Sequence, residues 1–161
     1  MVTITAAVLA LALAGPSEDP VTLQGIGLLR IGLPVAMLRS RFGAAEEEGD
    51  PESGCSYWTS PSYPDLAMMV VGGRLVRIDI AGPGYRTRSG AAVGMSESDI
   101  RAIYGRLMTV EPHPYTEPEG HYLVYRARDE PYGMIVETDN GRAVALRVGY
   151  WENVQWIEGC S

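Results

Sequence analysis

Lysine is absent from this sequence, and all 13 of its basic residues are arginine. Without a lysine amine, catalysis through a Schiff base on lysine is excluded. The sequence also lacks a glycine-rich phosphate loop leading into a long helix, and no serine has a nucleophile-elbow setting. Its 20 acidic residues offer many paired carboxylates, but these suit a solvated surface equally well. We therefore expect a binding protein rather than an enzyme, and no cofactor.

Positive charge is scarce as well. With 20 acidic residues against 13 arginines, the formal net charge is −7. Phosphate groups repel an acidic chain, and this disfavours nucleic acid and anionic lipid surfaces as partners. We expect the partner to be another envelope or extracellular protein.

The sequence has only two cysteines, Cys55 and Cys160, which lie far apart in the chain. In an oxidising compartment such a pair indicates one structural disulfide. Closing so long a loop would stabilise the fold by roughly 4 to 5 kcal/mol in the chain-entropy model. It would also hold the C-terminus against the middle of the chain. The alternative is two free thiols or a catalytic one.

Residues 1–14, MVTITAAVLALALA, carry no charge and end in Ala-Leu-Ala. This pattern is typical of a secretory signal peptide and its cleavage site, although a buried strand or helix is the alternative. The run is shorter than the ~20 apolar residues that span a bilayer. No cysteine follows it to carry a lipid anchor. We predict a periplasmic or secreted protein with no membrane span or lipid anchor in its mature chain, and a flexible leader over 15–22.

Residues 31–43 (IGLPVAMLRSRFG) and 93–105 (VGMSESDIRAIYG) have glycine, arginine and glycine at matching positions. Each segment predicts a short helix, over 35–42 and over 97–104. A proline precedes the first helix, a serine precedes the second, and a glycine follows each. Apolar pairs at i, i+4 would point into a shared core. Helices this short are not stable alone, so packing must hold them.

Antiparallel strands are expected after each helix. Residues 66–80 and 132–148 predict hairpins, with Gly-Gly and Asn-Gly as their turns. Further elements are expected as strands over 55–58, 121–125 and 153–160, and as an acidic loop over 43–54.

These elements predict an α+β fold of two tandem units, residues 23–83 and 84–161. Each unit is a short helix followed by antiparallel strands, and the second also contains the C-terminal strand. Neither unit can bury its apolar face alone, so the two are expected to share one core.

The pattern G-(M/L)-x-x-x-x-(I/L)-R-x-x-(F/Y)-G, followed by strands, resembles a type of bacterial envelope domain. It is similar to the small assembly-factor subunit of the outer-membrane β-barrel machinery and to the tandem form in the secreted β-lactamase inhibitor protein. The resemblance implies an α+β domain that binds another protein. The chain departs from the first by lacking an anchoring cysteine, and from the second by having one cysteine in each half. No inhibitory residue can be carried over.

The densest polar stretch is residues 110–125, which contains His113, Tyr115 and His121 among several glutamates. Imidazoles and carboxylates on one loop could bind a divalent ion, and a hydrolase or metal-dependent enzyme is our alternative function. The His-x7-His spacing is not a standard ligand spacing, so no metal is expected. Packed tyrosines with solvated glutamates, or a partner-recognition loop, are the other interpretations.

A second candidate site is the segment 81–90, which we interpret as a linker. Tyr85, Arg86 and Arg88 there could anchor an acidic partner, or they could simply solubilise the linker.

Tyrosine and tryptophan must supply much of the core volume, because the sequence has a single phenylalanine. We assign Trp58 and Trp156 to the core. Tyr150 and Trp151 are instead predicted to lie on an exposed recognition surface.

Overall fold

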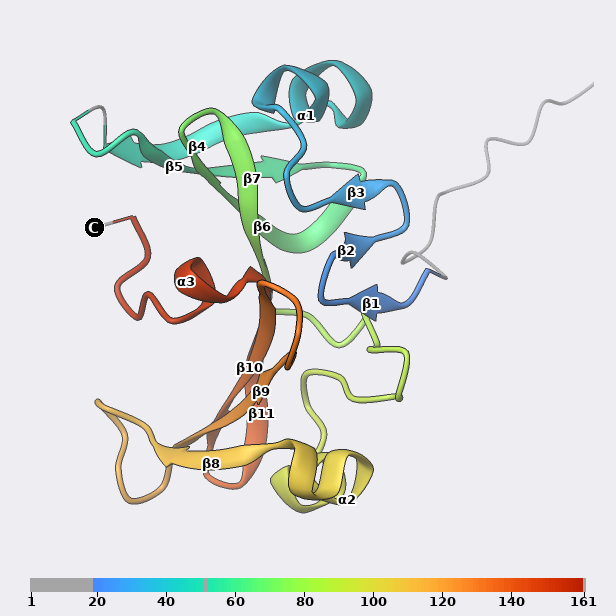
Figure 1. Ribbon diagram of the computed structural model, residues 1–161, viewed down its shortest axis with the longest axis vertical. Coiled ribbons are helices and arrows are strands. Elements are labelled where there is room, and N and C mark those ends of the chain that lie inside the picture. Colours follow the sequence, from blue (N-terminus) through green and yellow to red (C-terminus); the bar gives the residue numbers. More distant parts are fainter. Residues whose placement is uncertain (1–18, 51, 161) are drawn as a thin grey trace, which may run out of the picture.

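The computed structural model describes residues 19–50 and 52–160 (Figure 1). Eight of its strands are β4 (Ala45–Asp50), β5 (Cys55–Ser60), β6 (Tyr63–Val71), β7 (Arg74–Ile80), β8 (Thr109–Pro112), β9 (His121–Arg126), β10 (Tyr132–Asp139) and β11 (Arg142–Tyr150). They form one antiparallel sheet in the order β4-β5-β6-β7-β11-β10-β9-β8. A small sheet contains β1 (Val21–Thr22), β2 (Gly25–Ile26) and β3 (Leu29–Arg30).

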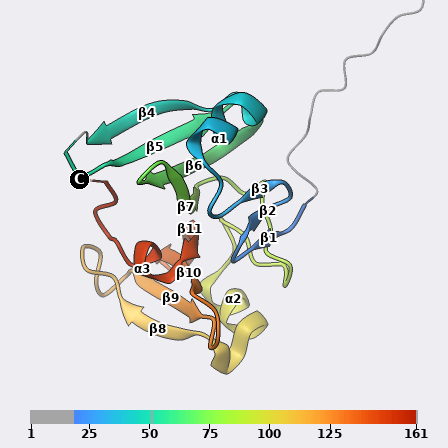
Figure 2. The same cartoon turned by 45° about the horizontal axis from the view of Figure 1, so that its top comes forward.

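The helices are short: α1 (Val35–Phe42), α2 (Glu97–Tyr104), a 3₁₀ turn (Gly105–Leu107) and α3 (Trp151–Val154). Helices α1 and α2 and the small sheet lie on one side of the large sheet (Figures 1 and 2). Helix α3 and the C-terminal segment, residues 155–160, lie on the other side. We call these two sides the core face and the tail face.

The core face contains the main hydrophobic core. Leu38 of α1 and Ile100 of α2 are fully buried, and both belong to the same cluster as Ile78 of β7 and Val148 of β11. A helix of eight residues is marginal in water. Packing on the sheet therefore stabilises both helices.

The predicted α+β fold of two tandem helix–strand units is wrong. Strand predominates over helix, and the strands form one continuous sheet because β7 pairs with β11, from Ile80↔Leu146 to Arg77↔Gly149. The edge of a hairpin has unpaired backbone N–H and C=O groups. Joining the two hairpins in the middle of the sheet satisfies those groups, which two separate units would leave open.

The two helices occupy the residues predicted for them. Gly43, after α1, has the left-handed conformation with φ of 62°. The hydroxyl of Ser96 accepts a hydrogen bond from the backbone N–H of Asp99 at 3.1 Å, which caps α2. The predicted hairpins are also present, as β6–β7 and β10–β11.

Two local predictions are wrong. The stretch 43–54 contains strand β4 rather than a loop, and β4 pairs with β5 at one edge of the sheet. Its side chains are almost all exposed and polar, so no apolar alternation indicated a strand. The stretch 153–160 contains the end of α3 and turns, but no strand. Side-chain contacts and a disulfide, rather than strand pairing, attach residues 153–160 to the rest of the molecule.

The predicted disulfide between Cys55 and Cys160 is confirmed, with 5.4 Å between the two Cα atoms. It joins the start of β5 to the C-terminal segment on the tail face. The chain-entropy argument applies to the long loop that this bond closes.

At the N-terminal end, the predicted signal peptide over 1–14 lies outside the described residues. The predicted leader over 15–22 overlaps β1, where Val21 is buried and pairs with Ile26. Among the residues that the structure describes, no helix has the length and apolar character needed to cross a membrane.

Candidate functional site

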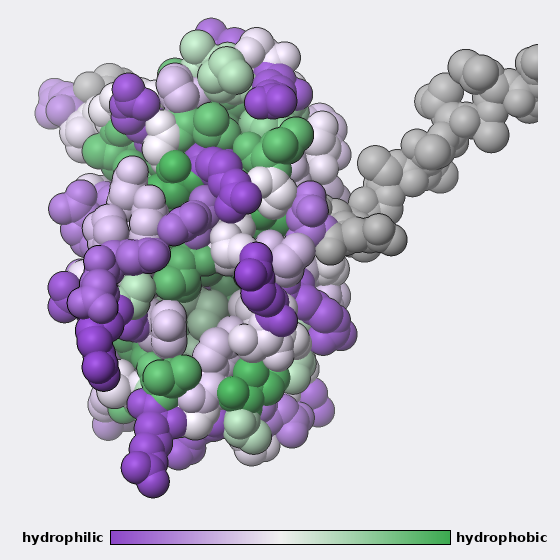
Figure 3. Space-filling model, turned by 45° about the vertical axis from the view of Figure 1, so that its right-hand side comes forward, coloured by the Kyte–Doolittle hydropathy of each residue, from purple (hydrophilic) through white to green (hydrophobic). Residues whose placement is uncertain are grey.

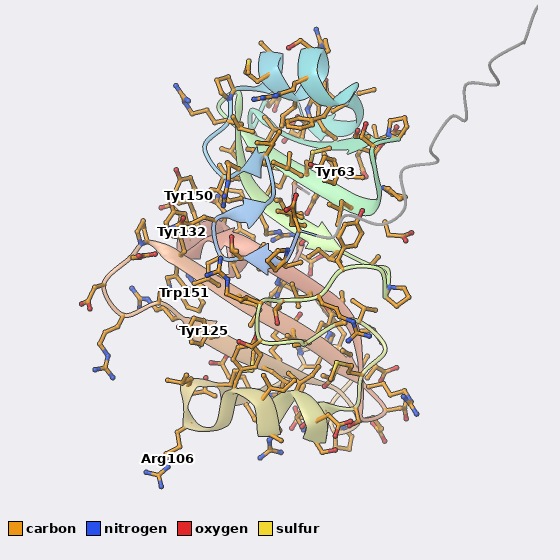
Figure 4. All side chains as sticks on the ribbon, turned by 90° about the vertical axis from the view of Figure 1, so that its right-hand side faces the viewer. Tyr63, Arg106, Tyr125, Tyr132, Tyr150 and Trp151 are labelled. Carbon is orange, nitrogen blue, oxygen red and sulfur yellow. A yellow bond between two sulfur atoms is a disulfide. The ribbon has the colours of Figure 1, made fainter. Side chains whose placement is uncertain are left out.

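Five side chains gather where three neighbouring strands meet. In antiparallel pairing, the last residues of β9 and β11 lie beside the first residues of β10. This brings together Tyr125, Arg126, Tyr132, Tyr150 and Trp151, which we call the aromatic end. Figure 4 shows its four aromatic side chains following one another along one side of the molecule.

The aromatic end is ordered by ring contacts. The rings of Tyr132 and Tyr150 stack with centroids 5.4 Å apart and an angle of 13° between their planes. The guanidinium of Arg126 lies over the Trp151 ring, 5.3 Å from its centroid. All four aromatic residues are partly exposed. Burial of part of the side chain raises the pKa of Tyr132, and its neighbour Tyr150 adds to this.

The position of Trp151 depends on Gly133. A Cβ atom at residue 133 would lie 2.4 Å from the Trp151 ring. Glycine therefore allows the indole to lie directly on β10, where it packs against a small cluster on the tail face.

A cavity of about 500 Å³ adjoins the aromatic end, between the small sheet and strand β9. Tyr125 belongs to both, and the cavity is also lined by Tyr104, whose ring centroid is 6.1 Å from that of Tyr125. Charged residues at its lining include Arg30, Arg88 and Glu130. Figure 3 shows this side of the molecule as hydrophobic surface between protruding hydrophilic side chains. The cavity thus places positively and negatively charged groups beside the aromatic end.

The three candidate residues of the predicted linker, Tyr85, Arg86 and Arg88, have different surroundings in the structure. Tyr85 is buried, and its hydroxyl donates a hydrogen bond to the carbonyl of Pro64 at 2.7 Å. Arg86 is exposed and donates to the carbonyl of Gly90 at 3.3 Å. Of the three, Arg88 alone lines the cavity beside Tyr125.

The two histidines are held by different carboxylates. His113 is buried, and its Nδ1 accepts hydrogen bonds from the backbone N–H groups of Tyr115 and Thr116. Its Nε2 therefore carries the proton and donates to Glu137 at 2.9 Å. Both ring nitrogens of His113 thus serve the fold, whereas the Tyr115 side chain is exposed.

His121 contacts a second carboxylate, Glu97, at 2.9 Å from Nδ1. The same carboxylate accepts a hydrogen bond from the hydroxyl of Thr138 at 2.9 Å. Burial raises the pKa of Glu97, but the hydrogen bonds from His121 and Thr138 outweigh it and bring the pKa below its ordinary value. Across the described residues, no group of three or more histidine, cysteine or carboxylate side chains is placed to hold a metal ion.

The two remaining tryptophan predictions have opposite outcomes. Trp58 is buried in the main core, as predicted. Trp156 is exposed on the C-terminal segment, because the disulfide and the turns after α3 keep that segment outside the sheet.

A second cavity, of about 490 Å³, lies on the tail face over β5, β7, β10 and β11. We call it the tail cavity. Its lining includes two buried arginines that sequence reasoning did not select, Arg77 and Arg147. The only sequence signal was that Arg77 and Asp79 alternate with apolar residues in β7, which predicts a polar and exposed face. The covering α3 and C-terminal segment bury that face instead.

Each of the three guanidinium nitrogens of Arg77 has a partner. Its Nε lies 2.9 Å from the carboxylate of Asp79, and its Nη2 donates to the hydroxyl of Tyr57 at 2.6 Å. Its Nη1 donates to the carbonyls of Asn153 and Trp156, at 3.0 and 2.7 Å. Arg77 thus holds the C-terminal segment on the sheet. Burial raises the pKa of Tyr57 to about 12, and the negative charge of Asp79 contributes to the rise.

No protein-family model and no curated protein matches this chain in sequence. The solved structures that the chain matches include two bacterial proteins. One is an extracellular protein containing an SCP domain from Bacillus anthracis, with a TM-score of 0.53 and 13% identity over 94% of this chain and 51% of that one. The other is a cysteine-rich secretory protein from Staphylococcus aureus, with a TM-score of 0.47 and 11% identity over 86% of this chain and 47% of that one.

The similarity to the Bacillus anthracis protein shows a shared fold, and the chain spans about half the length of that protein. That protein is not of the β-barrel assembly or β-lactamase inhibitor type that the glycine-bounded segments resemble. The disulfide between Cys55 and Cys160 suits an oxidising compartment. This agrees with the predicted periplasmic or secreted localisation.

Proposed function

We propose that this protein is an exported binding module that recognises another envelope or extracellular protein through its aromatic end. The observation that carries the proposal is the gathering of Tyr125, Arg126, Tyr132, Tyr150 and Trp151 at the ends of three strands. Tyrosine, tryptophan and arginine are the residues most enriched at the energetic centres of protein interfaces.

The aromatic end also suits binding because it is ordered before a partner arrives. The Tyr132–Tyr150 stack and the Arg126–Trp151 contact restrict side chains that would otherwise lose rotamer freedom on binding. The partly exposed rings still have apolar surface to bury. The adjoining cavity, with arginines and a glutamate at its lining, supplies charged groups for the rim of an interface.

A photo-crosslinking experiment tests the proposal. A benzophenone amino acid is placed at Tyr132 in the full chain, and a matched variant carries it at Val144, an exposed residue at the other end of β11. Irradiation in the producing organism should give one discrete crosslinked protein from position 132 and none from position 144. The same products from both positions, or none from either, would contradict the proposal.

The captured partner then allows affinity to be measured. Tyr132→Ala and Arg126→Ala should each weaken binding at least about tenfold, as interface hot spots do. Leu28→Ala is the matched control, because Leu28 is an exposed apolar residue in the small sheet region and outside the aromatic end. Equal affinities for all three variants would count against this surface.

A further inference from the structure

Arg147 lies at the tail cavity without the partners that a buried charge requires. Its side chain is about 93% buried, since the residue is only 7% exposed. Within the described part of the chain, its Nε and Nη2 have no hydrogen-bond partner, and no carboxylate forms an ion pair with it. The guanidinium lies over the Tyr122 ring, 5.0 Å from the centroid. Burying an unpaired guanidinium costs folding stability. Ligand binding is one function that would account for such a residue.

The register of the sheet shows why the protein itself leaves Arg147 unpaired. Asp79 lies directly opposite Arg147 on β7, but its carboxylate is bound to Arg77 at 2.9 Å. The next carboxylate in the cavity, Glu137, accepts the hydrogen bond from His113. Asp79 thus attracts Arg147 by its charge without accepting a hydrogen bond from it. A ligand acceptor would supply the missing hydrogen bonds.

We infer that the tail cavity binds a small zwitterion, such as an amino acid, whose carboxylate pairs with Arg147. The guanidinium fork matches a carboxylate in shape and charge. The walls include the apolar side chains of Ala67, Ile135 and Ala145, which suit an apolar substituent. A cavity of about 490 Å³ is within the range of small-molecule sites. This site lies on the tail face and is separate from the proposed protein-binding function.

The rim of the tail cavity is the reason for assigning a zwitterion rather than a simple anion. Glu47 and Glu48 of β4 line it and are exposed. Their negative charges would oppose the entry of a ligand that carries only a carboxylate. A ligand that also carries an ammonium group would be attracted to this rim while its carboxylate reaches Arg147.

Three related probes separate the contributions of the ligand's carboxylate and ammonium groups to binding by the wild-type protein. L-leucine carries both charges, N-acetyl-L-leucine keeps only the carboxylate, and L-leucinamide keeps only the ammonium. Binding is followed by shifts of backbone amide signals in ¹H–¹⁵N spectra. We expect L-leucine to shift signals of residues that line the tail cavity, with each derivative binding at least tenfold more weakly. No shift with L-leucine would overturn the assignment, and equal binding of N-acetyl-L-leucine would overturn its zwitterionic part.

Two variants then test Arg147 itself. Arg147→Met removes the charge, and Ala145→Leu fills the cavity while leaving the charge in place. Both should abolish the L-leucine shifts. Arg147→Met should also leave the melting temperature equal or higher, because an unpaired buried charge is removed. Arg77→Met is the matched control, and it should lower the melting temperature because it leaves Asp79 without its ion-pair partner. Unchanged binding in Arg147→Met, or a melting temperature lowered as much as in Arg77→Met, would overturn the inference.

Discussion

The same strands supply both faces of the large sheet, but the tail face buries arginines in addition to small apolar clusters. On β7 and β11, Ile78 and Val148 enter the apolar core, whereas Arg77 and Arg147 lie on the tail face. Helices α1 and α2 and the small sheet cover the core face, whereas α3 and the disulfide-bonded C-terminal segment cover the tail face. The core face accounts for stability by apolar burial. On the tail face Arg77 holds the C-terminal segment, whereas Arg147 has buried N–H groups without a partner in residues 19–50 and 52–160.

The largest loss of stability should come from removing the disulfide that holds the C-terminal segment on the tail face. A variant with both Cys55→Ser and Cys160→Ser loses the disulfide without leaving a free thiol. Its free energy of unfolding should fall by about 4 kcal/mol, because the unfolded chain is no longer cross-linked. Urea denaturation measures the change, and reductant should have no further effect on the variant. A midpoint equal to that of the oxidised wild-type protein would show that the cover depends on Arg77 rather than on the disulfide.

A cavity in the core face should cost somewhat less. Ile78 is fully buried, so Ile78→Ala should lower the free energy of unfolding by about 3 kcal/mol. Val144→Ala is the control, since Val144 is exposed on β11, and it should change stability by less than ~0.5 kcal/mol. Similar losses for the two variants would mean that the core face is not the tightly packed layer described above.

A smaller effect is expected where the aromatic end rests on β10. Gly133→Ala would place a methyl group against the Trp151 ring and should cost about 2 kcal/mol through overpacking. Combining it with Trp151→Ala should remove most of that additional cost, because the clashing ring is gone. Additive losses in the double variant would show that the glycine is needed for another reason. Denaturation followed by circular dichroism suits all three proteins.

The stability contributed by the two faces should also depend differently on pH. These are the smallest changes in stability that we predict. The pKa of Glu97 is lowered in the folded state, so its contribution is present above its ordinary value of 4.5 and is lost as the pH falls. The pKa of Tyr57 is raised to about 12, so its contribution is present below its ordinary value of 10.0 and is lost as the pH rises toward 12.

Thermal denaturation across pH checks these signs. Glu97→Gln should flatten the acid side of the stability curve and leave the alkaline side unchanged. Tyr57→Phe should flatten the alkaline side and leave the acid side unchanged. If each variant altered the opposite side, the assigned directions of the two pKa shifts would be wrong.

Local signals predicted local structure well. Helices α1 and α2 were expected at their observed bounds, because a glycine ends each and proline or serine precedes it. The two hairpins followed from Gly-Gly and Asn-Gly turns flanked by apolar strands. Strand β4 was missed, because an exposed edge strand of glutamates has no apolar period and is held by backbone pairing with β5.

The candidate sites were predicted less completely. Tyr150 and Trp151 were selected as surface aromatics, but their neighbours Tyr125, Arg126 and Tyr132 come from other strands and depend on register. Arg77 and Arg147 were not selected, because polar residues that alternate with apolar ones normally face water. Their burial follows from a segment at the other end of the chain. The core location expected for Trp156 was wrong for the same reason, since its place depends on that segment.

The hairpin turns, the ends of α1 and α2 and the disulfide could all be predicted from the amino-acid sequence. Each of these depends on neighbouring residues or on a unique pair of cysteines. Three features of the described residues emerged only from the fold: β7 pairs with β11, α3 and the C-terminal segment cover the polar side of the sheet, and Arg147 is buried without an ion-pair partner. These outcomes depend on contacts between residues far apart in the chain, and local periodicity carries no information about them.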